Sequence, residues 1–194
     1  MPKLGMPPRR RSELVEATIH EIGARGTLDV TVSQIARRAG MSSALAHHYF
    51  GSKEAIFAAA MRHILALYGA EVRGALAMAR TPRQRIEAIV RASFGPRQFH
   101  PETVSAWLNF YVQAQRSEAA RRLLHIYQRR LRSNLHHAFR QLAPDRARIL
   151  TRGTAAMIDG LYLRQSLGEG GIAPQTAIDV VLHYLDTSLA REPK

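Results

Sequence analysis

Residues 31–57 read TVSQIARRAGMSSALAHHYFGSKEAIF, and this stretch holds two very short helical patterns. The connection between them, Gly40-Met41-Ser42, is too short for anything but a helical corner. Gly40 favours the left-handed conformation that ends a helix, and Ser42 is a residue type that caps the next helix. The stretch therefore predicts a helix-turn-helix.

The first helix of this motif is predicted to begin near Val32. Thr31 and Gln34 have the spacing of a capping box, in which each side chain satisfies a backbone amide at the helix start. Ile35 is expected to face the core, whereas Arg37 is expected to point away from it.

The second helix is predicted over residues 43–48. Its first residues have small side chains, which suits a recognition helix. Small residues let its backbone approach base edges, while hydroxyl and imidazole groups hydrogen-bond to bases or phosphates. Ser52 is placed to cap a further helix, and Lys53 in the first turn of that helix is expected to meet a phosphate. The predicted DNA-contacting residues are Thr31, Ser33, Arg37, Ser42, Ser43, Ala44, His47, His48, Tyr49 and Lys53.

A metal site at His47 and His48 is the remote alternative. Adjacent side chains on a helix point about 100° apart, and no carboxylate is spaced to join the two histidines. The chain has no cysteine, which excludes thiolate ligands and disulfides. Contact with a groove or a phosphate is the better interpretation, and neither a metal nor a cofactor is predicted.

The stretch resembles the DNA-binding motif of the tetracycline-repressor (TetR) family. The likeness lies in an Ile-Ala-x-x-Ala-Gly helix, a serine-capped recognition helix, an aromatic-Phe ending and a Ser-Lys-Glu start to the next helix. Tyr49 and Lys53 match positions with which the family contacts phosphates. The resemblance implies a transcription regulator that uses the motif twice, in a two-fold homodimer on a palindromic double-stranded DNA operator.

The rest of the chain is predicted to be all-α, because helix-forming residues dominate after residue 52 and strand-type alternation is missing. Breaks between helices are predicted at Thr81-Pro82, at residues 94–101, at Ala143-Pro144 and at residues 168–174. The result is a TetR-like fold of about nine helices. We expect a helix-turn-helix DNA-binding domain over residues 1–53 and a helical ligand-sensing and dimerisation domain over residues 54–194.

The 194-residue chain carries a net charge of +13, and only three of its 28 cationic residues are lysine. The arginine side chain forks onto phosphates, so DNA fits this charge. An arginine-rich genome would give the same count, and the excess of positive charge is spread over the chain.

The N-terminus lacks the apolar core of a signal peptide, and no run of about 18 uncharged apolar residues is present. The sequence therefore predicts a cytoplasmic protein with no membrane partner.

The dimer surface is predicted on the last two helical segments, residues 149–167 and 174–189. Both segments are rich in apolar and small residues, and the end of the chain lacks the positive excess of the rest, as an interface favours. Two helices from each subunit would form a four-helix interface. The alternative is that these segments complete the core of a monomer.

Aromatic residues gather in the middle of the chain, where Trp107 has Phe110 and Tyr111 at helical spacing. Residues at this spacing usually belong to a core. The alternative is a box for a cation, because the faces of aromatic rings attract quaternary ammonium groups.

Scattered patches resemble a choline-responsive branch of the TetR family, the repressors of glycine-betaine synthesis. The patches include MPKLGM at residues 1–6, AWLNFY at 106–111 and IDGLYLR at 158–164. The resemblance implies that choline, or a related quaternary ammonium compound, relieves repression of genes for choline uptake and glycine-betaine synthesis.

The candidate ligand-binding residues are Trp107, Phe110, Tyr111, Asp159 and Tyr162. Asp159 is the candidate counter-charge, because it lies three residues before Tyr162 on the same helical face. A hydrogen bond in helix packing is at least as good an explanation for this aspartate.

Two other classes of function compete with a choline-responsive repressor. An enzyme needs converging catalytic groups or metal ligands, and the nine histidines form no HExxH pattern, nor does any GxSxG or phosphate-binding glycine loop occur. The sequence therefore predicts no catalytic residue. A TetR-type regulator of drug efflux or lipid metabolism stays open, because efflux sensors also bind cations in aromatic pockets.

Overall fold

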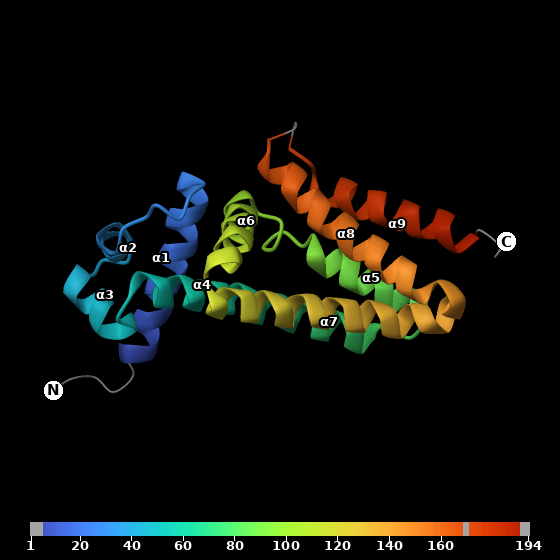
Figure 1. The fold of residues 1–194 in the computed structure, drawn as a ribbon, viewed down its shortest axis with the longest axis horizontal. Coiled ribbons are helices and arrows are strands. Elements are labelled where there is room, and N and C mark those ends of the chain that lie inside the picture. Colours follow the sequence, from blue (N-terminus) through green and yellow to red (C-terminus); the bar gives the residue numbers. More distant parts are fainter. Residues whose placement is uncertain (1–5, 169–170, 191–194) are drawn as a thin grey trace. The chain divides into compact units, whose positions relative to one another are not determined.

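The computed structural model describes residues 6–168 and 171–190, so most of the MPKLGM patch lies outside the described residues. Within these ranges the chain forms nine α-helices and one short 3₁₀ turn, with no strand (Figure 1). The all-α prediction is confirmed. The helices are α1 (Met6–Arg25), α2 (Val32–Arg38), α3 (Ser43–Phe50), α4 (Lys53–Met78), α5 (Pro82–Ser93), α6 (Pro101–Arg116), α7 (Glu118–Leu142), α8 (Ala147–Ser166) and α9 (Pro174–Ala190); the 3₁₀ turn η1 is Pro144–Arg146.

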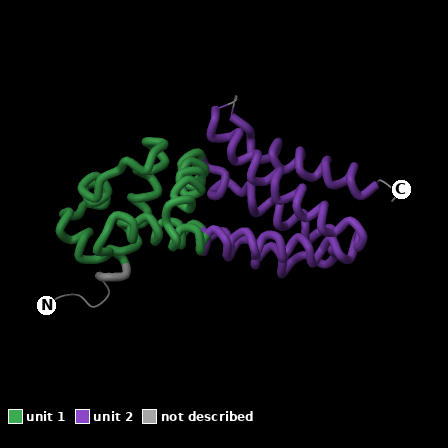
Figure 2. Tube along the Cα trace, viewed as in Figure 1, with its two compact units in different colours: residues 1–64, 101–123 green, residues 65–100, 124–194 purple. Residues whose placement is uncertain are grey.

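The chain divides into two compact units (Figure 2). Residues 1–64 and 101–123 form the N-terminal unit, and residues 65–100 and 124–194 form the C-terminal unit. Helix α6 therefore belongs with the helix-turn-helix, although it follows that motif by many residues. The predicted boundary after residue 53 separates a DNA-binding domain from a ligand-sensing domain. This division by function stays a prediction.

In the N-terminal unit, α1 packs against α2 and α6, and α2 packs against α3. The core contains Leu14, Ile35 and Ala46, which are fully buried. On the first turns of α1, Glu13 forms ion pairs with Arg9 and Arg10, which lie one turn closer to the N-terminus.

In the C-terminal unit, α9 packs against α8 and α5. Thr81 and Gln84 form a capping box at the start of α5, and Pro82 occupies the first turn of that helix. The four predicted breaks are confirmed. A fifth break, at Ser117 between α6 and α7, was not predicted; the Ser117 hydroxyl accepts a hydrogen bond from the backbone amide of Ala120.

Among the described helices, only α4 has the length and composition of a membrane-spanning helix. A core helix passes the same test, and α4 buries side chains in both units, among them Ile56, Ile64, Tyr68 and Val72. Arg62 also lies within its apolar stretch. Packing in the core therefore accounts for the apolar character of α4.

Candidate DNA-binding surface and effector site

The local geometry of the helix-turn-helix agrees with the sequence signals. The Thr31 hydroxyl accepts a hydrogen bond from the amide of Gln34 at 3.2 Å, and the Gln34 side chain accepts one from the amide of Thr31 at 2.8 Å. Gly40 has a φ of +64°. At the start of α3 the Ser42 hydroxyl accepts from the amide of Leu45 at 3.2 Å. The capping box, the turn and the second cap are confirmed.

Seven of the ten predicted DNA-contacting residues are exposed around this corner: Thr31, Ser33, Arg37, Ser42, Ala44, His47 and His48. Ser43 is half-buried, and its hydroxyl donates to that of Ser33 at 2.9 Å, which ties the starts of α2 and α3 together. His47 Nδ1 lies 3.2 Å from the carbonyl oxygen of Gly51. This bond restrains the ring of His47 at the end of α3.

The aromatic and basic residues at the α3–α4 junction are half-buried. The Nζ atom of Lys53 lies 5.3 Å from the centre of the Phe57 ring, and the ring of Tyr49 contacts His48 edge-on. The guanidinium of Arg11 lies over the ring of Phe50, 4.7 Å from its centre. The only sequence signal for Arg11 is the run of three arginines at residues 9–11. Arg11 adds a positive charge beside the recognition helix.

The two arginines at the end of α2 differ in what surrounds them. The Nε atom of Arg38 donates to the buried carboxylate of Glu21 on α1, and Arg25 donates to the same carboxylate at 3.1 Å. The hydrogen bond from Arg38 holds the pKa of Glu21 below its ordinary value, against the opposing effect of burial. Arg37 is exposed and forms no ion pair in the described part of the chain. Arg38 therefore positions α2, and Arg37 remains available to DNA.

The aromatic residues of α6 form one cluster in the N-terminal unit. Trp107 is only 4% exposed, and its ring centre lies 6.0 Å from that of Phe110 and 6.0 Å from that of Tyr111. Tyr111 is half-buried. Phe110 also lines a small gap together with Phe57 and Met61 of α4. The cluster thus extends from Tyr111 into the core beside the helix-turn-helix.

The other two ligand candidates lie on α8, in the C-terminal unit. The Tyr162 hydroxyl donates to the carbonyl oxygen of Ser93 at 2.5 Å, and the Tyr162 ring packs against Phe94 and Phe99. Asp159 is half-buried and lines a groove of about 210 Å³ that Arg132 and Arg152 also line. The five candidates are therefore divided between the two units, and their joint contact with one ligand stays a prediction.

Helices α1 and α6 approach each other closely at Gly23. A Cβ atom on Gly23 would overlap the backbone and side chain of Glu102. Nearby, Nδ1 of His20 lies 2.9 Å from Oε1 of Glu102. No sequence pattern pointed to this contact, because the residues are far apart in the chain. It joins α6, which carries Trp107, to α1, which packs against α2 of the helix-turn-helix.

Comparison with known families agrees with this arrangement. The profile of the bacterial regulatory proteins of the tetR family matches residues 14–60, and that described as BetI-type transcriptional repressor, C-terminal, matches residues 82–190. The chain thus belongs to the tetR family of DNA-binding transcription regulators. Within the family its C-terminal region is of the BetI repressor type.

Full-length relatives support the same conclusion. The HTH-type transcriptional regulator BetI of Brucella anthropi is 51% identical over 193 residues, which cover 99% of this chain and 100% of that protein. The regulator of the same name from Rhizobium meliloti is 52% identical over 190 residues, covering 97% and 94%. These relatives are transcription regulators, and the C-terminal region matches the BetI-type repressors, so this chain is a transcriptional repressor and not an enzyme.

Solved structures confirm the fold. A transcriptional regulator from Pseudomonas aeruginosa PAO1 superposes with a TM-score of 0.81 at 27% identity, over 95% of this chain and 92% of that one. A regulator from Saccharomonospora viridis, solved in complex with choline, superposes with a TM-score of 0.83 at 22% identity, over 92% and 96%.

Proposed function

We propose that this repressor senses choline, acts as a homodimer in the cytoplasm, and controls genes for choline uptake and glycine-betaine synthesis. Two helices α3, one from each subunit, would enter successive major grooves of a palindromic operator. Binding of choline, or of a related quaternary ammonium compound, would weaken this contact and relieve repression.

The observation that carries the proposal is the packing of α6 on α1. A ligand that displaces the Trp107 side chain changes the position that α6 can adopt. Glu102 of α6 lies directly against the backbone of Gly23 in α1. A shift of α6 toward α1 would therefore displace α1. Since α1 packs against α2, the displacement reaches the DNA-binding motif.

The α6 cluster has the chemistry that a quaternary ammonium ion requires. Such an ion cannot donate hydrogen bonds, so its recognition depends on ring faces and on burial of its methyl groups. Trp107 and Tyr111 supply two rings tilted by 32° to each other, and Tyr111 keeps part of its surface accessible. That a protein of this fold has been solved with choline supports the same choice.

The homodimer is supported by exposed apolar residues on α8 and α9. Ile149 is 65% exposed and Leu163 is 49% exposed, and a seven-residue spacing places them with Ala156 along one side of α8. Val180 of α9 is also exposed. By contrast, several apolar residues of the same two segments are buried within the chain: Ile158, Leu161, Ala177, Val181 and Leu185. The exposed set is the one that a partner subunit would cover.

The proposal is tested by a mobility-shift assay with the full chain and DNA from upstream of its own gene. Choline should lower the affinity for DNA, and by reciprocity DNA should lower the affinity for choline by the same factor. Tyr111→Ala should keep DNA binding but lose the response, whereas Val112→Ala, at an exposed neighbour, should keep both. An affinity for DNA that choline leaves unchanged would refute the proposal.

A further inference from the structure

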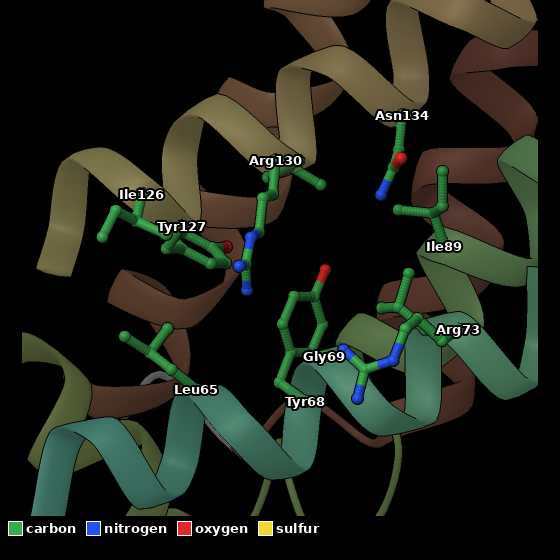
Figure 3. Close-up of a pocket in the computed structure, with 11 residues that line it drawn as sticks. Leu65, Tyr68, Gly69, Arg73, Ile89, Ile126, Tyr127, Arg130 and Asn134 are labelled. Carbon is green, nitrogen blue, oxygen red and sulfur yellow. The ribbon is translucent and has the colours of Figure 1, made fainter.

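Helix α7 carries a long run of positive charge. Residues 119–144 contain six arginines and no aspartate or glutamate, and all six arginines are exposed. Arg122 lies 4.0 Å from Glu118, and both of these side chains are largely exposed. Arg130 extends toward Tyr68, at the cavity between α4, α5 and α7 that Arg73 also lines (Figure 3). The other arginines of α7 point neither to an acidic neighbour on their own helix nor into this cavity.

Most of this charge in the C-terminal unit lies along one side of α7. Because an α-helix has 3.6 residues per turn, positions 125, 129, 132, 136 and 140 fall within about 80° of one another around its axis. We call these residues the basic stripe: His125, Arg129, Arg132, His136 and Arg140. At 1.5 Å per residue the stripe extends over about 22 Å. The opposite side of α7 is buried in the core and carries Tyr127, Leu131, Leu135 and Ala138.

The charge of the basic stripe is open to an external anion. Asp159 of α8 lines the groove between α7 and α8 together with Arg132. Arg129 and Arg140, by contrast, form no ion pair in the part of the chain that the structure describes. Like charges three or four residues apart on a helix repel each other, so the stripe destabilises α7 unless an anion binds there. A bound polyanion would remove this repulsion.

We infer that the basic stripe binds the phosphate backbone of double-stranded DNA, separately from α3. A guanidinium group donates two parallel hydrogen bonds to a phosphate, and a stripe of about 22 Å runs past about six phosphates of one DNA strand. Contacts to phosphates carry no sequence information, so this binding would not depend on sequence. The stripe lies outside both the helix-turn-helix and the aromatic cluster of α6, so the inference goes beyond the proposed function.

Duplex DNA fits the basic stripe better than a membrane or a single-stranded nucleic acid does. A helix that lies on a membrane inserts its apolar side among the lipids, but the apolar side of α7 is buried in the core. Proteins that bind single strands stack the bases on aromatic side chains, and the stripe contains no Phe, Tyr or Trp. The DNA backbone is also the polyanion that a DNA-binding regulator meets whenever it acts.

The test is binding of the full-length protein to a labelled duplex of random sequence, followed by fluorescence anisotropy at several salt concentrations. Arg37→Ala with Lys53→Ala weakens binding through the helix-turn-helix and provides the background. In this background, Arg129→Gln with Arg140→Gln should weaken binding about tenfold or more. The slope of log affinity against log salt should fall by about 2, because two phosphate contacts are lost.

Two further double variants in the same background are the controls. Arg80→Gln with Arg97→Gln removes the same charge from exposed positions elsewhere in the C-terminal unit, and should change the affinity and the salt slope much less. Arg129→Lys with Arg140→Lys keeps the charge of the stripe and should keep most of the salt slope. Circular dichroism of each variant checks its fold.

Unchanged affinity and salt slope in Arg129→Gln with Arg140→Gln would overturn the proposal, and so would an equal effect of Arg80→Gln with Arg97→Gln. Vesicles of phosphatidylglycerol offer phosphates without a duplex. Vesicle binding that depends on the stripe, together with duplex binding that does not, would assign the stripe to a membrane instead. The choline response, followed by Trp107 fluorescence, should persist in Arg129→Gln with Arg140→Gln, so failure of this DNA contact and failure of choline sensing are told apart.

Discussion

Glu102 on α6 lies against the backbone of Gly23 on α1 so closely that no side chain fits between the two residues. The same glutamate forms the 2.9 Å contact with His20, one turn earlier on α1. This partly exposed pair contributes about 1 kcal/mol or less. The close fit of Gly23 against Glu102, rather than the contact with His20, is therefore the main constraint on how α6 and α1 lie together.

Replacement of Gly23 by alanine should disturb this contact. The added methyl group would force α1 and α6 apart, and we expect a loss of about 1–3 kcal/mol in the free energy of unfolding. The matched control is Gly74→Ala, because no atom lies within 4 Å of a Cβ at this helical position. There alanine should stabilise by about 0.5–1 kcal/mol. Urea denaturation measures both, and equal effects would contradict the close packing.

The fold was predictable to the extent that its signals are local. The start of α2 is indicated by Thr31 and Gln34, and its end by Gly40, all within ten residues of one another. Prolines mark most of the other breaks between helices. Ser117 carries no comparable signal, because serine is common inside and outside helices, so the break between α6 and α7 was missed.

The site was less predictable because its contacts join distant parts of the chain. In the sequence, nothing distinguishes the role of Arg37 from that of Arg38. Only the packing of α1 against α2 shows that Arg38 donates a hydrogen bond to the Glu21 carboxylate. Likewise, nothing in the spacing of Arg73 and Arg130 indicates that they border one cavity. Such relationships depend on tertiary packing, which residue patterns do not encode locally.

The bond between Glu21 and Arg38 predicts how stability changes with acid. Because the pKa of Glu21 is lowered on folding, its contribution is present above its ordinary value of 4.5 and is lost as the pH falls through the folded value. Glu21→Gln should therefore cost about 1 kcal/mol at neutral pH and progressively less below pH 4.5.

Denaturation of both proteins across this pH range measures the difference. Glu16→Gln, at an exposed position on the same helix, is the control and should change stability little at any pH. A constant gap between wild type and Glu21→Gln from neutral to acid pH would mean that the carboxylate does not gain from Arg38.

Lys53 is expected to contact a DNA phosphate from the first turn of α4. Lys53→Ala should weaken binding to all DNA sequences alike, and the slope of log affinity against log salt should fall by about 1. Arg62→Ala removes an exposed charge from the same helix outside the predicted surface and should change the slope less. Fluorescence anisotropy at several salt concentrations measures both, and identical slopes for wild type and Lys53→Ala would remove this contact.

The homodimer depends on the exposed side of α8. Ile149→Arg or Leu163→Arg would bury a charge without a partner in the interface, so each should give monomers. Met78 is 81% exposed at the end of α4, and Met78→Arg should leave the dimer intact. Sedimentation equilibrium reports the mass directly. A dimer that survives both α8 substitutions must use a different surface.

The central claim, that the aromatic cluster of α6 senses choline, is tested most directly by the fluorescence of Trp107, the only tryptophan in the chain. We expect a saturable change on titration with choline, a weaker one with glycine betaine, whose carboxylate the cluster does not attract, and none in Tyr111→Ala. A flat titration of folded wild-type protein would contradict the claim, and so would a response that survives in Tyr111→Ala.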